Sequence, residues 1–127
     1  SFGNGCRFCT LSHAATARAH LGAEAAVVDA VMANLDTAPV SERLRALLRI
    51  ADRVRVTGQA VGAEHVAAAK AAGASAMQVH DTVIVAAAFC MFNRYVDGLA
   101  TWTPKDPDIY RQTGEMLATK GYLHSIR

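Results

Sequence analysis

Residues 75–99 read SAMQVHDTVIVAAAFCMFNRYVDGL, and this stretch decides the fold. Ser75 followed by Gln78 is the pattern of a capping box, which predicts a helix beginning directly after Ser75. The helical pattern continues to about residue 99 and gives the longest helix of the chain. Its segment 83–91 is apolar on every side, which predicts that this helix is central and buried.

The rest of the chain predicts five more helices. We place them at about residues 6–21, 23–34, 42–57, 63–72 and 107–120, each ended by a glycine or a loop. Ser41 and Asp106 are expected caps, and Pro107 stands at a first helical position. With 26 alanines and no convincing hairpin, the chain is predicted to be all-α, with about six helices in a single domain, residues 1–127.

Composition restricts the class of protein. A net charge of +2 is too small to indicate nucleic-acid binding. No signal peptide is recognised and no apolar run approaches ~20 residues, so we expect a cytoplasmic protein with no membrane partner. The alanine-rich, apolar helix faces favour burial against another subunit, and hence a homo-oligomer, over a purely internal core. Because Ser1 already lies in the motif-bearing region, we expect a domain truncated at its N-terminus that lacks its first helices.

The chemistry-bearing motif is Cys6-Arg7-Phe8-Cys9, with His13 four residues later. On a helix these two thiols and the imidazole fall within an arc of roughly 60°. A cysteine at a helix N-terminus is driven toward the reactive thiolate, which predicts Cys6 as the more acidic thiol. The spacing also allows a Cys6–Cys9 disulfide, with His13 as a base, and so favours thiol–disulfide or peroxide chemistry.

Three other interpretations stay open. A zinc site needs a fourth ligand, and the other histidines offer no second close pair. Haem attachment needs a histidine directly after the second cysteine, where Thr10 stands. The thiols could also be inert and buried, which is the expectation for Cys90 in its apolar run. Near the end of the long helix, Arg94 and Asp97 are expected to pair at i, i+3.

Three segments together resemble the AhpD-like, peroxidase-related branch of the carboxymuconolactone decarboxylase family. They are GCRFCTLSH at residues 5–13, FNRYVDG at 92–98, and the pattern Y-x3-G-x2-L-A-x2-G-Y between Tyr110 and Tyr122. The resemblance covers nearly the whole chain. It implies an AhpD-like all-helical fold in symmetric trimers or hexamers, with alkylhydroperoxidase or disulfide-reductase activity and neither metal nor cofactor.

The resemblance also implies roles for the three motif residues. Cys9 would attack the peroxide, Cys6 would be its disulfide partner, and His13 would belong to the proton relay. The chain departs from the family's best-studied peroxidases at Phe8, where they carry a histidine. The glutamate that they use, about a dozen residues before the first cysteine, corresponds to no position of this chain.

From this sequence we therefore expect an antioxidant thiol peroxidase that reduces hydroperoxides. Its dithiol would be restored by a thiol or dithiol reductant whose identity the sequence does not reveal. Two alternatives belong to other classes. One is a non-enzymatic, redox-sensing or structural helical oligomer that keeps the motif without turnover. The other is a decarboxylase-type member of the family, although such members typically lack the dithiol.

Overall fold

Six α-helices and three short 3-10 turns make up the computed structural model, which describes residues 1–123. The helices are α1 (Arg7–Leu21), α2 (Ala26–Ala33), α3 (Glu42–Val56), α4 (Ala63–Ala71), α5 (Ala76–Gly98) and α6 (Pro107–Lys120). The described residues contain no strand, so the predicted all-α class with about six helices is confirmed.

The helix starts follow the caps that the sequence predicts. At α5, Ser75 Oγ accepts the Gln78 N–H at 3.1 Å, and Gln78 Oε1 accepts the Ser75 N–H at 3.0 Å. This is the reciprocal capping box, which satisfies two amides that have no partner inside the helix. At α6, Asp106 Oδ1 accepts the Asp108 N–H at 2.9 Å, and Pro107 takes the first helical position.

The second helix is the exception, because it begins three residues later than expected. Residues Gly22–Glu24 form a 3-10 turn, and α2 starts only at Ala26. Gly22 has φ 54°, a left-handed conformation that glycine adopts without steric cost. The chain therefore breaks sharply after α1 instead of running on into the next helix.

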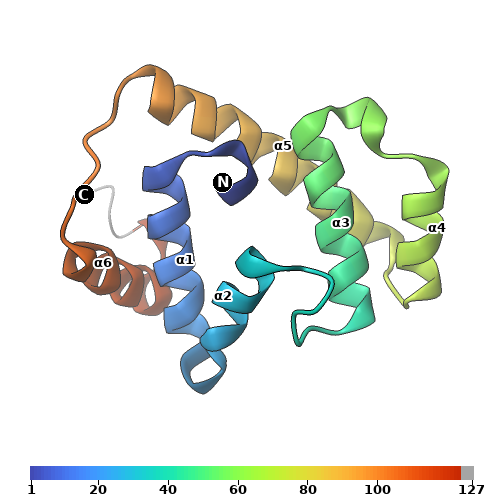
Figure 1. Ribbon diagram of the computed structural model, residues 1–127, viewed down its shortest axis with the longest axis horizontal. Coiled ribbons are helices and arrows are strands. Elements are labelled where there is room, and N and C mark those ends of the chain that lie inside the picture. Colours follow the sequence, from blue (N-terminus) through green and yellow to red (C-terminus); the bar gives the residue numbers. More distant parts are fainter. Residues whose placement is uncertain (124–127) are drawn as a thin grey trace.

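Two groups of helices are joined by the long helix (Figure 1). Helices α1 and α6 pack side by side at one end, while α3, α4 and α5 pack together at the other. The main core lies in the second group, where the buried residues are Ala46, Ile50, Val54, Ala69 and Ala74. Four of these five positions are alanine or valine, so the core of the single chain is small.

The long helix is not buried in this chain, and the expectation of a central, buried α5 is wrong. Asn93 is its only buried residue. One face packs inward, through Val79, Val83 and Ala86. The opposite face leaves seven large apolar side chains exposed, at positions 77, 84, 85, 91, 92, 95 and 99. A helix that is apolar all round needs neighbours on every side, and the other helices of one chain cover only one face.

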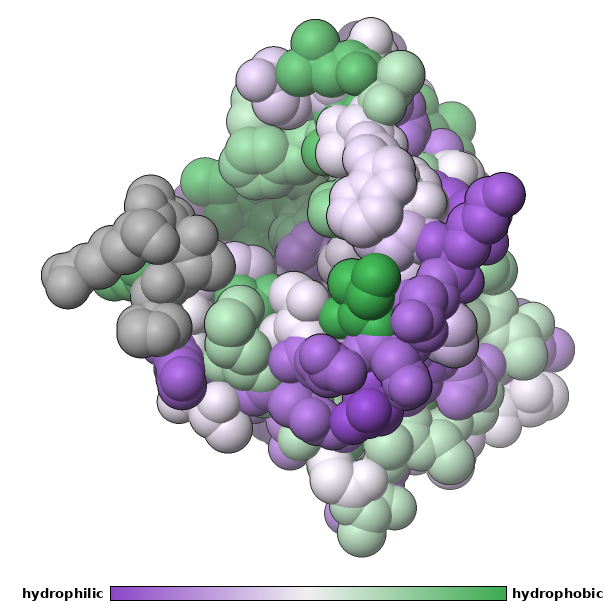
Figure 2. Space-filling model, turned by 90° about the vertical axis from the view of Figure 1, so that its left-hand side faces the viewer, coloured by the Kyte–Doolittle hydropathy of each residue, from purple (hydrophilic) through white to green (hydrophobic). Residues whose placement is uncertain are grey.

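Figure 2 shows one side of the molecule, where hydrophobic surface lies both in a hollow and on outward-facing parts. Among residues 1–123, α5 is also the one helix long and apolar enough, by length and composition alone, to cross a membrane. This departs from the expectation that no segment reaches that size. A single helix of this kind is only a weak indication of a membrane protein, and α5 carries His80, Asp81, Arg94 and Asp97.

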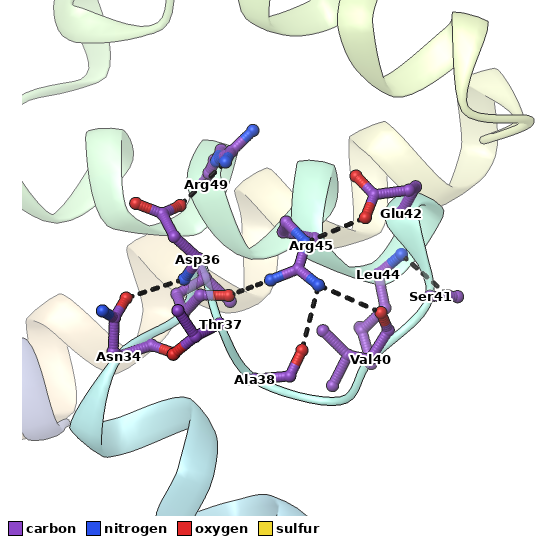
Figure 3. Close-up of polar contacts among 11 residues, drawn as sticks. Asn34, Asp36, Thr37, Ala38, Val40, Ser41, Glu42, Leu44, Arg45 and Arg49 are labelled. Atoms are coloured by element: carbon purple, nitrogen blue, oxygen red, sulfur yellow. Dashed lines mark hydrogen bonds and ion pairs between the residues drawn. The ribbon is translucent and has the colours of Figure 1, made fainter.

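A buried arginine ties α3 to the loop that precedes it (Figure 3). The Arg45 side chain donates to the carbonyl oxygens of Leu35, Ala38 and Val40, the last two at 2.9 and 3.3 Å. Its Nε donates to Glu42 Oε1 at 3.1 Å. Arg45 thus occupies a buried position on α3, while the neighbouring Leu44 is exposed.

We expect Arg45→Met to lower the free energy of unfolding by about 3 kcal/mol, as measured by urea denaturation. Methionine matches the length of the side chain but leaves the loop carbonyls without donors, and buried groups of this kind are costly to leave unpaired. Arg49→Met is the matched control, because Arg49 forms an exposed ion pair with Asp36 at 2.8 Å, worth at most about 1 kcal/mol. Equal losses in the two variants would contradict this account.

Candidate redox site

Both cysteines of the motif lie at the buried start of α1. Cys6 is the N-cap residue and is 0% exposed, while Cys9 stands in the first turn and is 4% exposed. Gly5, at φ 74°, turns the chain into the helix, and the Cys6 carbonyl accepts the Thr10 N–H at 3.0 Å. The two thiols are free and lie next to each other, close enough for Cys9 to raise the pKa of Cys6. The structure therefore brings together the two sulfur atoms that a disulfide would join.

An amide network holds the N-terminal segment against α5. Asn4 Nδ2 donates to Asn93 Oδ1 at 2.8 Å and contacts Cys90 Sγ at 3.5 Å. Asn93 Nδ2 donates in turn to Ser1 Oγ at 3.1 Å, and Asn93 is 1% exposed. Because Cys6 follows Asn4 by two residues, this network fixes where the dithiol lies. The sequence signal for this network is an asparagine inside a helix. Asparagine is unfavourable there unless its side chain has a hydrogen-bond partner.

The third thiol, that of Cys90, contacts this amide network and is not part of the buried core. Cys90 is half-buried and lies next to the Asn4 amide. It was expected to be an inert thiol inside an apolar run, and the partial exposure of α5 is the reason it is not fully buried. Cys90 can therefore serve as an internal control for the reactivity of Cys6 and Cys9.

The carboxylate of Asp97 lies near the Cys6 thiol and contributes to raising its pKa. The predicted Arg94–Asp97 pair is wrong, because Arg94 instead donates to the Cys90 carbonyl oxygen at 3.0 Å. Cys90, Asn93 and Asp97 follow one another at i, i+3 and i+7, which places them on one face of α5. That face lies against the start of α1, so the dithiol gains an acidic neighbour that the motif alone does not contain.

Burial raises the pKa of Cys6 to about 12, with further contributions from the hydrogen bonds to Cys9 and Asp97. The prediction that the helix start drives Cys6 toward the thiolate is therefore wrong for this arrangement. The helix N-terminus favours a thiolate, but loss of solvent disfavours the charged form more strongly. A neighbouring carboxylate acts in the same direction, since it repels the thiolate and accepts the thiol proton. Cys6 is thus held as a neutral thiol at physiological pH.

The imidazole of His13 lies one turn beyond Cys9 but engages aromatic side chains. Its Nδ1 is 3.1 Å from the Tyr122 hydroxyl, and its ring meets Phe89 edge to face at 4.7 Å. Within residues 1–123, no hydrogen bond joins His13 to either thiol. Burial lowers the pKa of His13, because a half-buried imidazole loses hydration of its charged form. His13 is therefore neutral at pH 7 and able to accept a proton.

No group of three or more His, Cys, Asp or Glu side chains that could hold a metal ion occurs among the described residues. Two cavities among residues 1–123 are large enough to hold a ligand, and neither is lined by Cys6 or Cys9. The larger, of about 940 Å³, reaches Asn4, Phe89 and Cys90, which are neighbours of the dithiol and of His13. The arrangement offers two adjacent thiols, a neutral imidazole on the same helix and a carboxylate.

Comparisons with protein families, characterised proteins and solved structures found no match. The resemblance to the AhpD-like branch thus rests on the residues quoted above and stays a prediction. The structure adds that the Cys6 and Cys9 thiols lie next to each other at the start of α1.

Proposed function

We propose that this chain is a thiol peroxidase that reduces hydroperoxides through reversible oxidation of Cys6 and Cys9, and that it acts in the cytoplasm. The observation that carries the proposal is the proximity of the two free thiols at the start of α1. Thiols this close can form a disulfide without a large movement of the backbone. The resemblance of residues 5–13 to the AhpD-like motif supports the same chemistry.

The reaction proceeds in two steps. The Cys9 thiolate attacks the terminal oxygen of ROOH, the O–O bond breaks, and the leaving alkoxide takes a proton to become an alcohol. Cys9 is then a sulfenic acid, and the Cys6 sulfur attacks it, so that the S–S bond forms and water leaves. A thiol or dithiol reductant returns two electrons and restores both thiols.

The raised pKa of Cys6 supports Cys9 as the attacking residue. The pKa of Cys6 is about 12, which leaves almost none of it as thiolate at neutral pH. Such a thiol suits the second step, in which it loses its proton only as the disulfide forms. Asp97, beside Cys6, is placed to take up that proton. This carboxylate would supply an acid–base group that the motif itself does not contain.

A second candidate function is redox sensing without turnover, and the burial of both thiols favours it. Burial limits access to the two thiols, which slows both their attack on peroxide and their reduction by an external thiol. Turnover separates the two functions. With tert-butyl hydroperoxide and excess dithiothreitol, a peroxidase consumes many equivalents of peroxide above the protein-free rate. Consumption of a single equivalent would favour the sensor, and consumption of none would overturn both proposals.

We also propose that the exposed apolar face of α5 is covered by further copies of this chain, in a trimer or hexamer. Met77, Ile84 and Met91 repeat every seven residues, as do Val85, Phe92 and Leu99. With Tyr95 they fall within an arc of roughly 120° along the whole helix. A continuous stripe of this kind suits packing against another helix.

We expect the protein to sediment as an oligomer at micromolar concentration. Ile84→Glu combined with Met91→Glu should produce smaller species, because a charge buried at a helix interface is strongly unfavourable. Ala87→Glu is the control, since Ala87 is exposed on the same helix outside the stripe. A parent protein that sediments as a folded monomer of 13.5 kDa would contradict the proposal.

A further inference from the structure

A second cavity, of about 630 Å³, lies between α1 and α6. Its apolar lining comes from Leu11, Ala15 and Ala19 on α1 and from Pro107 and Tyr110 on α6. The volume falls within the range of small-molecule sites in proteins, roughly 300–1,000 Å³. It is therefore large enough for a small organic ligand with an apolar body.

This cavity and the dithiol lie on different faces of α1. At about 100° per residue, Leu11, Ala15 and Ala19 share one side of the helix, while Cys9 and His13 point to the opposite side. Neither of these two residues lines the cavity. A ligand bound here would not touch the thiols, so the cavity is a separate feature of the molecule.

The walls of the cavity are held in place by specific contacts. The Tyr110 hydroxyl donates to the Pro104 carbonyl oxygen at 3.0 Å, which leaves the ring of Tyr110 to form a wall. The Tyr110 ring also packs edge to face with Phe8, their centroids 6.4 Å apart. At Gly114, an added Cβ would come within 2.7 Å of the Ala15 carbonyl carbon, so the two helix backbones touch there. These contacts hold α1 and α6 together beside the cavity.

Charged side chains at the cavity are mostly cationic. The lining contains Arg7, Arg18, Lys105 and Arg111 but only one carboxylate, Glu115. An excess of positive charge beside an apolar wall is complementary to a molecule with one anionic end and an apolar body. Two of the four cations are already neutralised by carboxylates.

The neutralised cations are Arg111 and Arg18. Arg111 donates to Asp108 and Glu115 at 3.1 and 3.2 Å, and Arg18 pairs with Asp29. Within residues 1–123, the side chains of Arg7 and Lys105 form no hydrogen bond or ion pair. These two groups are therefore available to bind an anion.

We propose that this cavity binds a free carboxylic acid with an apolar chain, whose carboxylate lies at Arg7 and Lys105. The chain of the acid would lie along Leu11, Ala15 and the ring of Tyr110. Guanidinium and ammonium groups form strong, charge-assisted hydrogen bonds with carboxylates. The apolar wall contributes to binding by removing the chain from water. This site does not depend on the proposed peroxidase function.

The test is isothermal titration calorimetry of the full chain with sodium octanoate, and with octan-1-ol as the uncharged comparison. We expect octanoate to bind at one site and octan-1-ol to bind at least about tenfold more weakly. The double variant R7Q/K105Q should weaken octanoate binding by at least about tenfold, since one lost ion pair of about 1.4 kcal/mol has that effect. Ala19→Phe, which adds bulk to the wall, should weaken both ligands.

The matched control is R43Q/K70Q, which removes two exposed cations outside the cavity. It changes the net charge by the same amount and should leave octanoate affinity unchanged. Equal affinities in the two double variants would overturn the proposal, because they would show attraction to overall charge only. Failure of octanoate to bind the folded parent protein would also overturn it, while leaving the dithiol chemistry untouched.

Discussion

A Cys9→Ser variant is expected to consume no hydroperoxide above the protein-free rate, whatever reductant is present. A serine hydroxyl is not ionised at neutral pH and does not form the sulfenic acid from which a disulfide arises. The measurement is loss of tert-butyl hydroperoxide with excess dithiothreitol. Cys90→Ser is the matched control, because Cys90 lies near the same segment but outside the thiol pair, and it should retain the parental rate.

Cys6→Ser should behave differently from Cys9→Ser. It keeps the attacking thiol, so one equivalent of peroxide should be reduced rapidly, leaving a sulfenic acid on Cys9 that a dimedone label detects. Without Cys6 the intramolecular disulfide cannot form. A sulfenic acid on Cys6 in Cys9→Ser, with none on Cys9 in Cys6→Ser, would show that the two cysteines have the opposite roles.

His13→Gln is expected to slow oxidation of the dithiol by at least about 100-fold at pH 7. General-base assistance typically contributes ~10²–10⁴ to a rate, and His13 is neutral at this pH because burial lowers its pKa. Glutamine keeps a polar side chain of similar reach but cannot take up a proton. Stopped-flow measurement of the first oxidation, with one equivalent of peroxide, isolates this step.

The pH dependence gives a further readout for His13. Because its pKa is lowered from 6.5, the loss of the parental rate on acidification should begin at a lower pH than an imidazole of ordinary pKa would impose. The variant should recover partly at high pH, where the thiol ionises unaided. His80→Gln, at an exposed histidine paired with Asp81 at 3.1 Å, serves as the control. A His13→Gln protein that reacts at the parental rate would make His13 a structural neighbour only.

Local signals in the sequence predicted the helices well, because caps and stops act over a few residues. Ser75 with Gln78, and Asp106 with Pro107, mark helix starts that the structure confirms. The burial of α5 could not be predicted in this way. An apolar run shows that a helix needs neighbours, but not whether they belong to the same chain. Arg45 was also missed, since its buried partners are carbonyl groups of a loop, which leave no pattern in the sequence.

For the candidate site too, local features could be predicted from the sequence and long-range contacts could not. The proximity of Cys6 and Cys9 follows from their spacing on one helix and was predictable. The raised pKa of Cys6 depends on burial and on Asp97, which lies 91 positions further along the chain. The network between Asn4 and Asn93 is equally distant in sequence. Such contacts depend on how the helices pack, and local periodicity carries no information about that packing.

The measurement that tests the central claim most directly is thiol counting by mass spectrometry after one equivalent of hydroperoxide. Alkylation before and after treatment, followed by peptide mapping, reports which cysteines have been oxidised. The account predicts loss of two thiols, an intramolecular Cys6–Cys9 disulfide, a free Cys90, and full recovery of all three thiols with dithiothreitol. Complete labelling of Cys6 and Cys9 after peroxide treatment would contradict the account.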